Sequence, residues 1–482
     1  MVARPPIVAI LGHVDHGKTT LLDYIRKSRL AAKEYGGITQ RIGAYEIRTD
    51  IKGYKTDRIT FIDTPGHEAF SQLRARGAQI ADIAILLIDA KDSVMPQTTE
   101  SISHIKASGI PFIVVMNKID LPDADPDKVK TDLMKYEVHV EGKGGTIPVV
   151  PISAKTGKGI SELLETILLV ASDLNLTYET NHEPKAYVIE TKKDKRGVVA
   201  SLIIKDGTLK IGDVVFVGDR KAKIKSMLND QGTQIRQVFP STPFELLGFE
   251  EMPEVGTSIS KTPSEKKESQ ILSTEPKRID EASFLQPKTE QKKLSLIIKA
   301  DSQGTLDAVY NSLVKNENIK IVLSAVGDIH KSDIFLAKTT KSIVIGFSAG
   351  VAPEVASLAK QEKIIIKTYQ VIYELLDELR EVAQLLKEKE TKERNLKGEA
   401  KILASFIIEK EKIYGVKVTK GKINLSDELE VHRQNKPIGK TRIVSLKIRA
   451  KSVSEIKKDQ EAGMLFDSQL DFRIGDVVKS IL

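Results

Sequence analysis

The sequence predicts a multidomain α/β plus β protein: a P-loop α/β domain, a β-barrel, a small α/β domain, a long connecting helix and a C-terminal β-barrel. Three features lead to this prediction. They are a glycine-rich loop between an apolar strand and a helix, two regions of short β segments separated by turn residues, and a long run of apolar residues at helical spacing. The expected boundaries are 1–178 for the P-loop domain, 184–258 for the first barrel, 259–292 for a linker, 293–369 for the small α/β domain, 370–397 for the helix and 398–482 for the C-terminal barrel.

The composition is that of a chain with several globular domains. At roughly 100–200 residues per domain, 482 residues suggest about three to five domains. The chain has no cysteine, which excludes disulfides and thiolate metal sites. No stretch reaches the ~18–20 consecutive apolar residues that cross a membrane, and the N-terminus is unlike a signal peptide. We therefore expect a cytoplasmic monomer that does not contact a membrane.

The first domain alternates short apolar runs with amphipathic segments. Its expected strands are 7–11, 59–62, 83–88 and 112–116, and its clearest helices are 97–108 and 161–170. Nearly continuous apolar runs of this length are typical of parallel strands that helices cover on both faces. In such a sheet, ligands bind at loops that follow the carboxyl ends of the strands.

The loop after the first strand matches the phosphate-loop pattern G-x-x-x-x-G-K-[ST], and Thr20 begins the helix that follows. The matching residues are Gly12, His13, Val14, Asp15, His16, Gly17, Lys18 and Thr19. The glycines let consecutive N–H groups turn toward phosphate oxygens, and the Lys18 ammonium completes the cradle. The Thr19 hydroxyl is placed to ligate the Mg²⁺ of a nucleoside triphosphate. Glycine-rich turns also precede helices for packing reasons alone, so the assignment depends on what lies downstream.

A second element, Asp63-Thr64-Pro65-Gly66-His67, follows the strand 59–62. A carboxylate at a strand end can hold Mg²⁺ through water. The Gly66 N–H can approach a terminal phosphate because no side chain stands in the way. Alone, these residues read as an ordinary turn, but after a phosphate loop in a parallel-sheet domain they predict the second part of a nucleotide site.

A third element predicts which base is bound. In Asn117-Lys118-Ile119-Asp120, the Asp120 carboxylate can accept two hydrogen bonds from guanine that adenine does not offer. The Asn117 amide can brace neighbouring loops, and the Lys118 stem can lie along the base. Ser153-Ala154-Lys155 can supply the Ala154 N–H to guanine O6. Four elements in this order predict a site for GTP and GDP with Mg²⁺.

The remainder of the chain reads as further modules. Expected strands are 186–190, 198–204, 214–217 and 222–226 in the first barrel, 294–299, 319–323, 343–347 and 364–366 in the small α/β domain, and 403–409, 415–419, 428–433 and 442–447 in the last barrel. Both barrels contain the run I-G-D-V-V, at 211–215 and 474–478, which suggests two copies of one barrel type.

Positive charge is concentrated in the last module. Residues 396–482 carry 18 Lys and Arg against 12 Asp and Glu, so +6 of the chain's net charge of +8 falls there. A basic module beside an almost neutral remainder suggests a polyanionic partner. A solvated lysine-rich surface is an equally good reading of the charge alone.

These motifs resemble those of the translational GTPases, and most closely the bacterial translation initiation factor two family. The resemblance covers essentially 4–482. Besides the nucleotide motifs it includes Arg4-Pro5-Pro6, the run 36–45, Val94-Met95-Pro96-Gln97-Thr98, Pro240-Ser241-Thr242-Pro243, the run 298–304 and Tyr369-Gln370-Val371-Ile372-Tyr373. It implies a factor that recruits formylmethionyl initiator tRNA, promotes joining of the 30S and 50S ribosomal subunits, and hydrolyses GTP in contact with ribosomal RNA.

The resemblance also implies roles for individual residues. Thr39 would complete Mg²⁺ coordination when the terminal phosphate is present, and His67 would orient the attacking water. Val14 and Ile38 would form an apolar gate that holds His67 away until the ribosome acts. In the last barrel, Arg433, Glu461 and Gly463 are the candidate contacts to the initiator tRNA.

Two other functions fit part of this pattern. An elongation-type or specialised tRNA-delivery GTPase would share the nucleotide motifs, although here a small α/β domain and a long helix follow the first barrel. A GTP-switched ribosome or RNA-binding assembly module would need the switch but no hydrolysis. The presence of both Thr39 and His67 argues against that reading.

Overall fold

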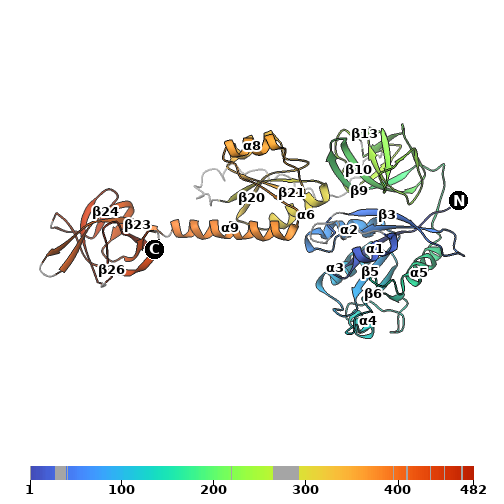
Figure 1. The fold of residues 1–482 in the computed structure, drawn as a ribbon, viewed down its shortest axis with the longest axis horizontal. Coiled ribbons are helices and arrows are strands. Elements are labelled where there is room, and N and C mark those ends of the chain that lie inside the picture. Colours follow the sequence, from blue (N-terminus) through green and yellow to red (C-terminus); the bar gives the residue numbers. More distant parts are fainter. Residues whose placement is uncertain are drawn as a thin grey trace, which may run out of the picture. The chain divides into compact units, whose positions relative to one another are not determined.

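The computed structural model describes residues 2–27, 39–40, 42–218, 220–263, 293–394, 396–408, 411–434, 436–449, 451–467 and 470–481. These residues form two compact units (Figure 1). The first contains residues up to 263 together with 294–380, and the second contains the residues from 381 onward. The predicted fold class is confirmed, since α/β and β modules follow one another in the expected order. Within the described residues, no helix is long and apolar enough to span a membrane.

The P-loop domain is a six-stranded sheet in the order β3-β4-β2-β5-β6-β7, in which only the β3–β4 pair is antiparallel. Its strands are β2 (Ile7–Gly12), β3 (Gly43–Arg48), β4 (Arg58–Asp63), β5 (Ile83–Asp89), β6 (Phe112–Asn117) and β7 (Val149–Pro151). Its helices are α1 (Lys18–Arg26), α2 (Ser71–Ile80), α3 (Pro96–Ser108), α4 (Pro126–Met134) and α5 (Ile160–Asp173), with the 3-10 turn η2 (Glu68–Phe70) before α2.

The apolar runs explain why these strands are central. Every residue of β2 and β5 is buried, as expected of parallel strands covered on both faces. Helices α1 and α5 pack on one face, where Leu21 and Leu163 join the core with Ile85. Figure 1 shows helices on both sides of the sheet. The phosphate loop and the two downstream motifs therefore leave the same edge of the sheet.

The first barrel is an antiparallel sheet in the order β13-β12-β18-β9-β10-β17-β14-β15. Its strands are β9 (Lys185–Asp194), β10 (Gly197–Asp206), β12 (Val214–Val217), β13 (Arg220–Lys223), β14 (Ser226–Asn229), β15 (Gln234–Ile235), β17 (Pro243–Leu247) and β18 (Ser258–Ser260). In the same region β11 (Leu209–Lys210) pairs with β16 (Gln237–Val238) as a separate two-stranded sheet. Another two-stranded sheet, outside the barrel, pairs β1 (Val2–Ala3) with β8 (Thr177–Tyr178). Strand β18 pairs with both β9 and β12, so the barrel extends past the expected boundary at 258. Most of the expected linker, 264–292, lies outside the described residues.

The small α/β domain is a parallel sheet in the order β20-β19-β21-β22. Its elements are β19 (Leu294–Ala300), α6 (Gln303–Leu313), β20 (Ile319–Val326), α7 (Lys331–Thr340), β21 (Ile343–Phe347), α8 (Pro353–Gln361) and β22 (Ile366–Tyr369). The last strand begins at Ile366, so the sequence placed it too early. The long helix α9 (Ile372–Arg394) ends before the expected residue 397, because Leu396 already pairs with Ile481 in the terminal barrel.

The terminal barrel closes on itself. Its strands are β23 (Leu396–Ile408), β24 (Glu411–Asn424), β25 (Glu428–Arg433), β26 (Lys436–Ile448), β29 (Glu461–Phe466) and β30 (Val477–Ile481), with the short β27 (Lys451–Ser452) and β28 (Glu455–Lys457) at its margin. Pairing runs β23-β30-β25-β26-β29-β24, and β24 also pairs with β23. The core inside the ring includes the aromatic group Tyr414, Phe466 and Phe472.

The repeated I-G-D-V-V run forms the same turn in both barrels. Gly212 and Gly475 adopt φ of 94° and 98°, a left-handed conformation that favours glycine. In each turn the aspartate accepts a backbone N–H three residues earlier, Lys210 for Asp213 and Arg473 for Asp476. The shared sequence therefore encodes one local turn used twice.

A buried polar junction joins the first strand region to the first barrel. The Arg4 guanidinium donates two hydrogen bonds to the Asp82 carboxylate at 2.6 and 2.7 Å, and a third to the Ser241 hydroxyl at 3.3 Å. Ser241 in turn donates to the Pro5 carbonyl at 2.5 Å, and its own carbonyl accepts from Thr60 at 2.6 Å. Two runs far apart in sequence, 4–6 and 240–243, therefore meet here.

We expect Arg4→Ala to destabilise the chain by about 3 kcal/mol, because it leaves the buried Asp82 carboxylate with only the Ile7 N–H, at 2.9 Å, and the Lys205 ammonium, at 3.2 Å, among its described partners. The measurement is urea unfolding followed by circular dichroism. A matched control is Arg58→Ala, which breaks the partly exposed pair with Glu46 and should cost less than about 1 kcal/mol. Equal losses in the two variants would contradict the prediction.

Candidate functional site

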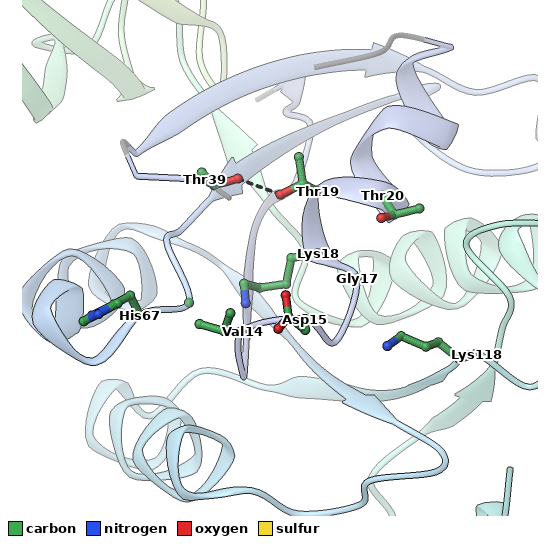
Figure 2. Close-up of a pocket in the computed structure, with 10 residues that line it drawn as sticks. Val14, Asp15, Gly17, Lys18, Thr19, Thr20, Thr39, His67 and Lys118 are labelled. Atoms are coloured by element: carbon green, nitrogen blue, oxygen red, sulfur yellow. Dashed lines mark hydrogen bonds between the residues drawn. The ribbon is translucent and has the colours of Figure 1, made fainter. Parts of the chain in front are cut away.

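A cavity of about 280 Å³ lies at the carboxyl edge of the six-stranded sheet. Its lining residues are Val14, Asp15, Gly17, Lys18, Thr19, Thr20, Thr39, Gly66, His67 and Lys118. All ten are residues that the sequence singles out, and they come from four separate segments of the chain. Figure 2 shows Lys18 in the middle of this group, extended toward Val14, with Thr39 facing Thr19.

The phosphate loop needs both of its glycines. A Cβ at Gly12 would lie 2.3 Å from the Leu87 carbonyl oxygen, and one at Gly17 would lie 2.4 Å from the Asn117 amide nitrogen. Both residues also have positive φ, 155° and 91°. The loop can therefore pass close to β5 and β6 only with glycine at these positions.

Lys18 reaches back across the loop. Its ammonium donates to the Gly12 carbonyl at 2.9 Å and to the His13 carbonyl at 2.6 Å. Burial lowers the pKa of Lys18 to about 8, although the Asp63 carboxylate works in the opposite direction. A phosphate group beside this ammonium would favour its charged form.

Three oxygen-bearing side chains meet beside the loop. The Thr19 and Thr39 hydroxyl oxygens are 2.6 Å apart (Figure 2). Thr39 also donates to an Asp63 oxygen at 3.4 Å. Hydroxyl and carboxylate oxygens are the ligands that Mg²⁺ prefers. The donor set therefore fits the expected Mg²⁺ ion.

The Asp63–His67 segment closes the cavity from the side of β4. A Cβ at Gly66 would lie 2.5 Å from the Lys18 ammonium nitrogen and 3.0 Å from the Val14 backbone nitrogen, so this glycine faces the phosphate loop directly. Thr64 anchors the segment by donating to the Ile10 carbonyl at 2.7 Å.

His67 lies at the margin of the cavity and is 9% exposed. Its Nδ1 accepts the Ala69 backbone N–H at 2.8 Å, and its ring packs against Tyr373 with the ring centroids 4.1 Å apart. Burial lowers the pKa of His67, so the ring is neutral at pH 7.

Gln40 is held at the start of α9, the helix that carries Tyr373. Its amide nitrogen donates to the Gln370 carbonyl, and its amide oxygen accepts the Ile372 N–H. Ile38, the expected partner of Val14 in an apolar gate, lies outside the described residues.

The guanine-recognition motifs lie next to each other and share hydrogen bonds. Asn117 donates to the His16 carbonyl at 2.8 Å and accepts the Ala154 N–H at 2.9 Å. Asn117 therefore braces two loops, as expected. The Ala154 N–H, which the sequence assigned to guanine O6, is engaged by this amide oxygen in the structure. Lys118 pairs with Asp89 at 2.7 Å.

Asp120 is an exposed residue of this region. A hydrogen bond with Ser153 lowers the pKa of Asp120, which keeps the carboxylate ionised. Ser153 itself is buried, and Lys155 is exposed beside it. The four elements are thus adjacent in space, although Asp120, Ser153 and Lys155 do not line the cavity that holds Lys18.

In the terminal barrel, the three candidate tRNA contacts do not form one site. Arg433 is tied to the Asp476 carboxylate at 2.9 and 2.8 Å, next to the I-G-D-V-V turn. Gly463 pairs with Lys447, at the opposite end of β26 from the Arg433 pairing. Glu461 is exposed, with Lys417 4.0 Å away.

The comparisons with known proteins follow the order of these modules. Residues 4–173 match the elongation factor Tu GTP binding domain, 183–262 match elongation factor G domain 2, and 268–380 match the translation-initiation factor 2 family model. Translation initiation factor IF-2 of Thermus thermophilus is 40% identical over 99% of this chain and 86% of its own length. The chain belongs to the translation initiation factor IF-2 family.

Other members of the IF-2 family differ in length. The factor of Geobacillus is 40% identical and that of Bartonella bacilliformis 42%, and the chain spans 68% and 58% of their lengths. A solved structure, GDP-bound aIF5B from Aeropyrum pernix, is 28% identical over 99% of this chain and 92% of that chain, with a TM-score of 0.48. The matches to the GTP-binding domain and to the IF-2 family make this chain a translational GTPase of initiation that binds guanine nucleotide.

Sequence reasoning missed three residues that support the pocket of this IF-2 family member. Arg74 donates to the carbonyls of the segment 65–67 and pairs with Glu100, and Gln97 accepts the Val14 N–H at 2.9 Å. One signal could have revealed Arg74. It lies four residues before the buried Ala78, on the apolar stripe of α2, where a surface arginine is not expected.

The buried His16 side chain makes the stability of the folded chain depend on pH. Its side chain is 1% exposed, and burial lowers its pKa from 6.5 to about 4. The unfolded chain therefore takes up a proton first as the pH falls, so the stabilisation is complete above pH 6.5 and is lost toward pH 4. Between pH 7 and 5 we expect the chain to lose about 2 kcal/mol that His16→Gln does not lose, measured by urea unfolding.

His182 gives a control of opposite sign. It is exposed, and its hydrogen bond with Asp206 raises its pKa, so its contribution is present at low pH and declines as the pH rises. His182→Gln should therefore not reduce the acid sensitivity. Identical pH profiles for wild type and His16→Gln would show that His16 does not carry the effect.

Proposed function

We propose that this chain recruits and stabilises formylmethionyl initiator tRNA on the 30S subunit, promotes joining of the 50S subunit, and hydrolyses GTP in contact with ribosomal RNA. It would do so as a monomer in the cytoplasm. The single observation that carries the proposal is the convergence of Lys18, Thr19, Thr39 and Gly66 on one cavity in a member of the IF-2 family whose similarity extends through the terminal barrel.

The phosphates would lie in the cavity that the P-loop forms. The N–H groups of residues 12–20 and the Lys18 ammonium supply positive charge there, and the N-terminus of α1 adds its partial charge. Thr19, Thr39 and Asp63 would hold Mg²⁺, which neutralises charge on the phosphates when it is bound. Gly66 would sense the terminal phosphate through its N–H. Release of that phosphate would free Thr39, which is the order–disorder switch of GTPases.

Asp120 would select guanine through two hydrogen bonds. The support is its exposed, ionised carboxylate beside Ser153. Asn117 would fix the relative positions of the phosphate loop and the Ala154 loop, since it bonds both of them. For the Ala154 N–H to reach guanine O6, it would have to leave Asn117 or share its hydrogen bond. Lys118 and Lys155 would flank the base.

His67 would orient the attacking water. In this structure its Nδ1 accepts a backbone N–H and its ring packs on Tyr373, so the side chain must rotate before it can act. That arrangement agrees with a slow basal rate and with activation by the ribosome. Val14 and Ile38 would form the apolar gate in its path. Hydrolysis then depends mainly on positioning and charge stabilisation.

We expect His67→Ala to keep GTP binding but to lower ribosome-stimulated hydrolysis at least about a hundredfold, because it removes the group that orients the water. The measurements are nucleotide Kd and phosphate release with ribosomes present. His182→Ala, in the segment between β8 and the first barrel, is the matched control and should hydrolyse GTP normally. A His67→Ala rate within about tenfold of wild type would exclude the catalytic role.

The terminal barrel would hold the formylmethionyl end of the tRNA, with Arg433, Glu461 and Gly463 as candidate contacts. Contact of Arg433 with RNA would compete with the bonds of its guanidinium to Asp476 and to the Asp471 carbonyl. The basic charge of residues 396–482 supports an RNA partner for this barrel.

The test that separates initiation from tRNA delivery is protection of the aminoacyl ester. The chain should slow hydrolysis of formylmethionyl-tRNA about tenfold or more while protecting methionyl-tRNA much less. A chain ending at Arg394, which retains the P-loop domain, should bind GTP but give no protection. Equal protection of the formylated and unformylated tRNA would favour a tRNA-delivery factor, and protection of neither would favour an assembly module.

A further inference from the structure

Arg74 is the largest fully buried side chain among the described residues, with an exposure of 0%. One of its terminal nitrogens, Nη1, donates to the carbonyls of Pro65, Gly66 and His67 at 2.9, 3.0 and 2.6 Å. The other, Nη2, donates to both oxygens of Glu100 at 2.8 and 2.7 Å. A single guanidinium thus forms hydrogen bonds with three consecutive backbone carbonyls next to the cavity.

Glu100 makes this burial possible. A buried charge is costly unless it is paired and hydrogen-bonded, and the bidentate arginine–carboxylate pair meets both conditions. Burial would raise the pKa of Glu100, but hydrogen bonds from His104, Ser71 and Arg74 lower it to about 2. The Glu100 carboxylate is therefore ionised at neutral pH and can accept both hydrogen bonds from Arg74.

The geometry of the peptide bond connects Arg74 to the phosphate site. In a trans peptide the C=O and the N–H point in opposite directions, and the described residues contain no cis bond. The Pro65 carbonyl belongs to the same peptide unit as the Gly66 N–H. When Arg74 fixes that carbonyl, the Gly66 N–H is directed away from Arg74. A donor on the carbonyl also polarises the unit and strengthens its N–H as a donor.

The other side of this segment is the phosphate loop. Gly66 faces the Lys18 ammonium and the Val14 backbone nitrogen closely enough that a Cβ would be within 3.0 Å of both. Helix α3 supports both sides, because Gln97 accepts the Val14 N–H and Glu100 holds Arg74 three residues later. The spacing between the phosphate loop and Gly66 is thus set from one helix.

We propose that Arg74 is a positioning residue that aims the Gly66 N–H at the terminal phosphate of GTP, with Glu100 fixing its guanidinium. Arg74 acts through the backbone and does not touch the nucleotide. It therefore contributes to binding of GTP and to hydrolysis, and it contributes little to binding of GDP, which has no terminal phosphate. The inference rests on the proposed role of Gly66 as the phosphate sensor.

The test compares the Kd for GDP with the Kd for a non-hydrolysable GTP analogue in the full chain. We expect Arg74→Met to weaken binding of the analogue at least about fivefold more than binding of GDP, and to lower ribosome-stimulated kcat about tenfold or more. Arg74→Lys, which keeps the charge and some of the carbonyl bonds, should recover part of both effects. Arg76→Met is the matched control, since Arg76 lies on the same helix but pairs with Asp307.

Removal of Arg74 alone leaves the partly buried Glu100 carboxylate without its main partner and risks unfolding. The double variant Arg74→Met/Glu100→Gln removes both charges and should fold, with GDP affinity within about twofold of wild type as the sign of an intact pocket. Its binding of the GTP analogue should still be weakened at least about fivefold more than its binding of GDP.

Parallel weakening of GDP and GTP-analogue binding, or no change in either, would overturn the assignment and leave Arg74 a structural residue. Failure of the wild-type chain to bind the analogue would instead contradict the proposed function itself. The two failures are therefore distinguishable.

Discussion

The nucleotide pocket depends on buried polar side chains that tie its loops to one another. A parallel sheet brings the phosphate loop and the motifs after β4 and β6 to one edge, but it does not fix the distances between them. Their backbone groups are buried and need partners. Asn117 joins the phosphate loop to the Ala154 loop, Gln97 holds Val14, and Arg74 gathers the carbonyls after Asp63. These bonds fix the positions of the lining residues relative to one another.

A second set of ties joins the modules of the first unit. Glu190, in the first barrel, accepts the Gly304 N–H at 3.0 Å and the Ser302 hydroxyl at 3.0 Å, at the start of α6. Burial raises the pKa of Glu190. The Arg4–Asp82–Ser241 junction and the hydrogen bonds of Gln40 are contacts of the same kind. These contacts give a structural role to residues that resemble the family but lie outside the nucleotide-binding motifs. Such residues hold the modules in place.

Much of the P-loop domain and its pocket could be predicted from sequence, because the signals are local. A glycine-rich loop between a strand and a helix, or a carboxylate at a strand end, specifies its own position, and nine of the ten cavity residues lie in such local motifs. The tenth, Thr39, was identified only from the resemblance to the family. Long-range pairings carry no such signal. The sequence did not reveal that Arg74 is buried, that Ala154 bonds Asn117, or that Arg433 pairs with Asp476, since each depends on a partner distant in the chain. The helix α9 ends earlier than the sequence predicted for the same reason, because Leu396 pairs with Ile481 near the C-terminus.

The closure of the terminal barrel limits how it can recognise anything. A sheet with a free edge can bind an extended peptide by adding it as another strand, through main-chain hydrogen bonds that any sequence can supply. In the ring from β23 to β24, each principal strand already has a neighbour on both sides. A partner of this barrel would therefore be recognised by side chains and loops and not by addition of a strand. Among the described residues, the sheet of the first barrel ends in the edge strands β13 and β15. Arg220, Lys221 and Lys223 give β13 the charges that keep such an edge from pairing with a second chain.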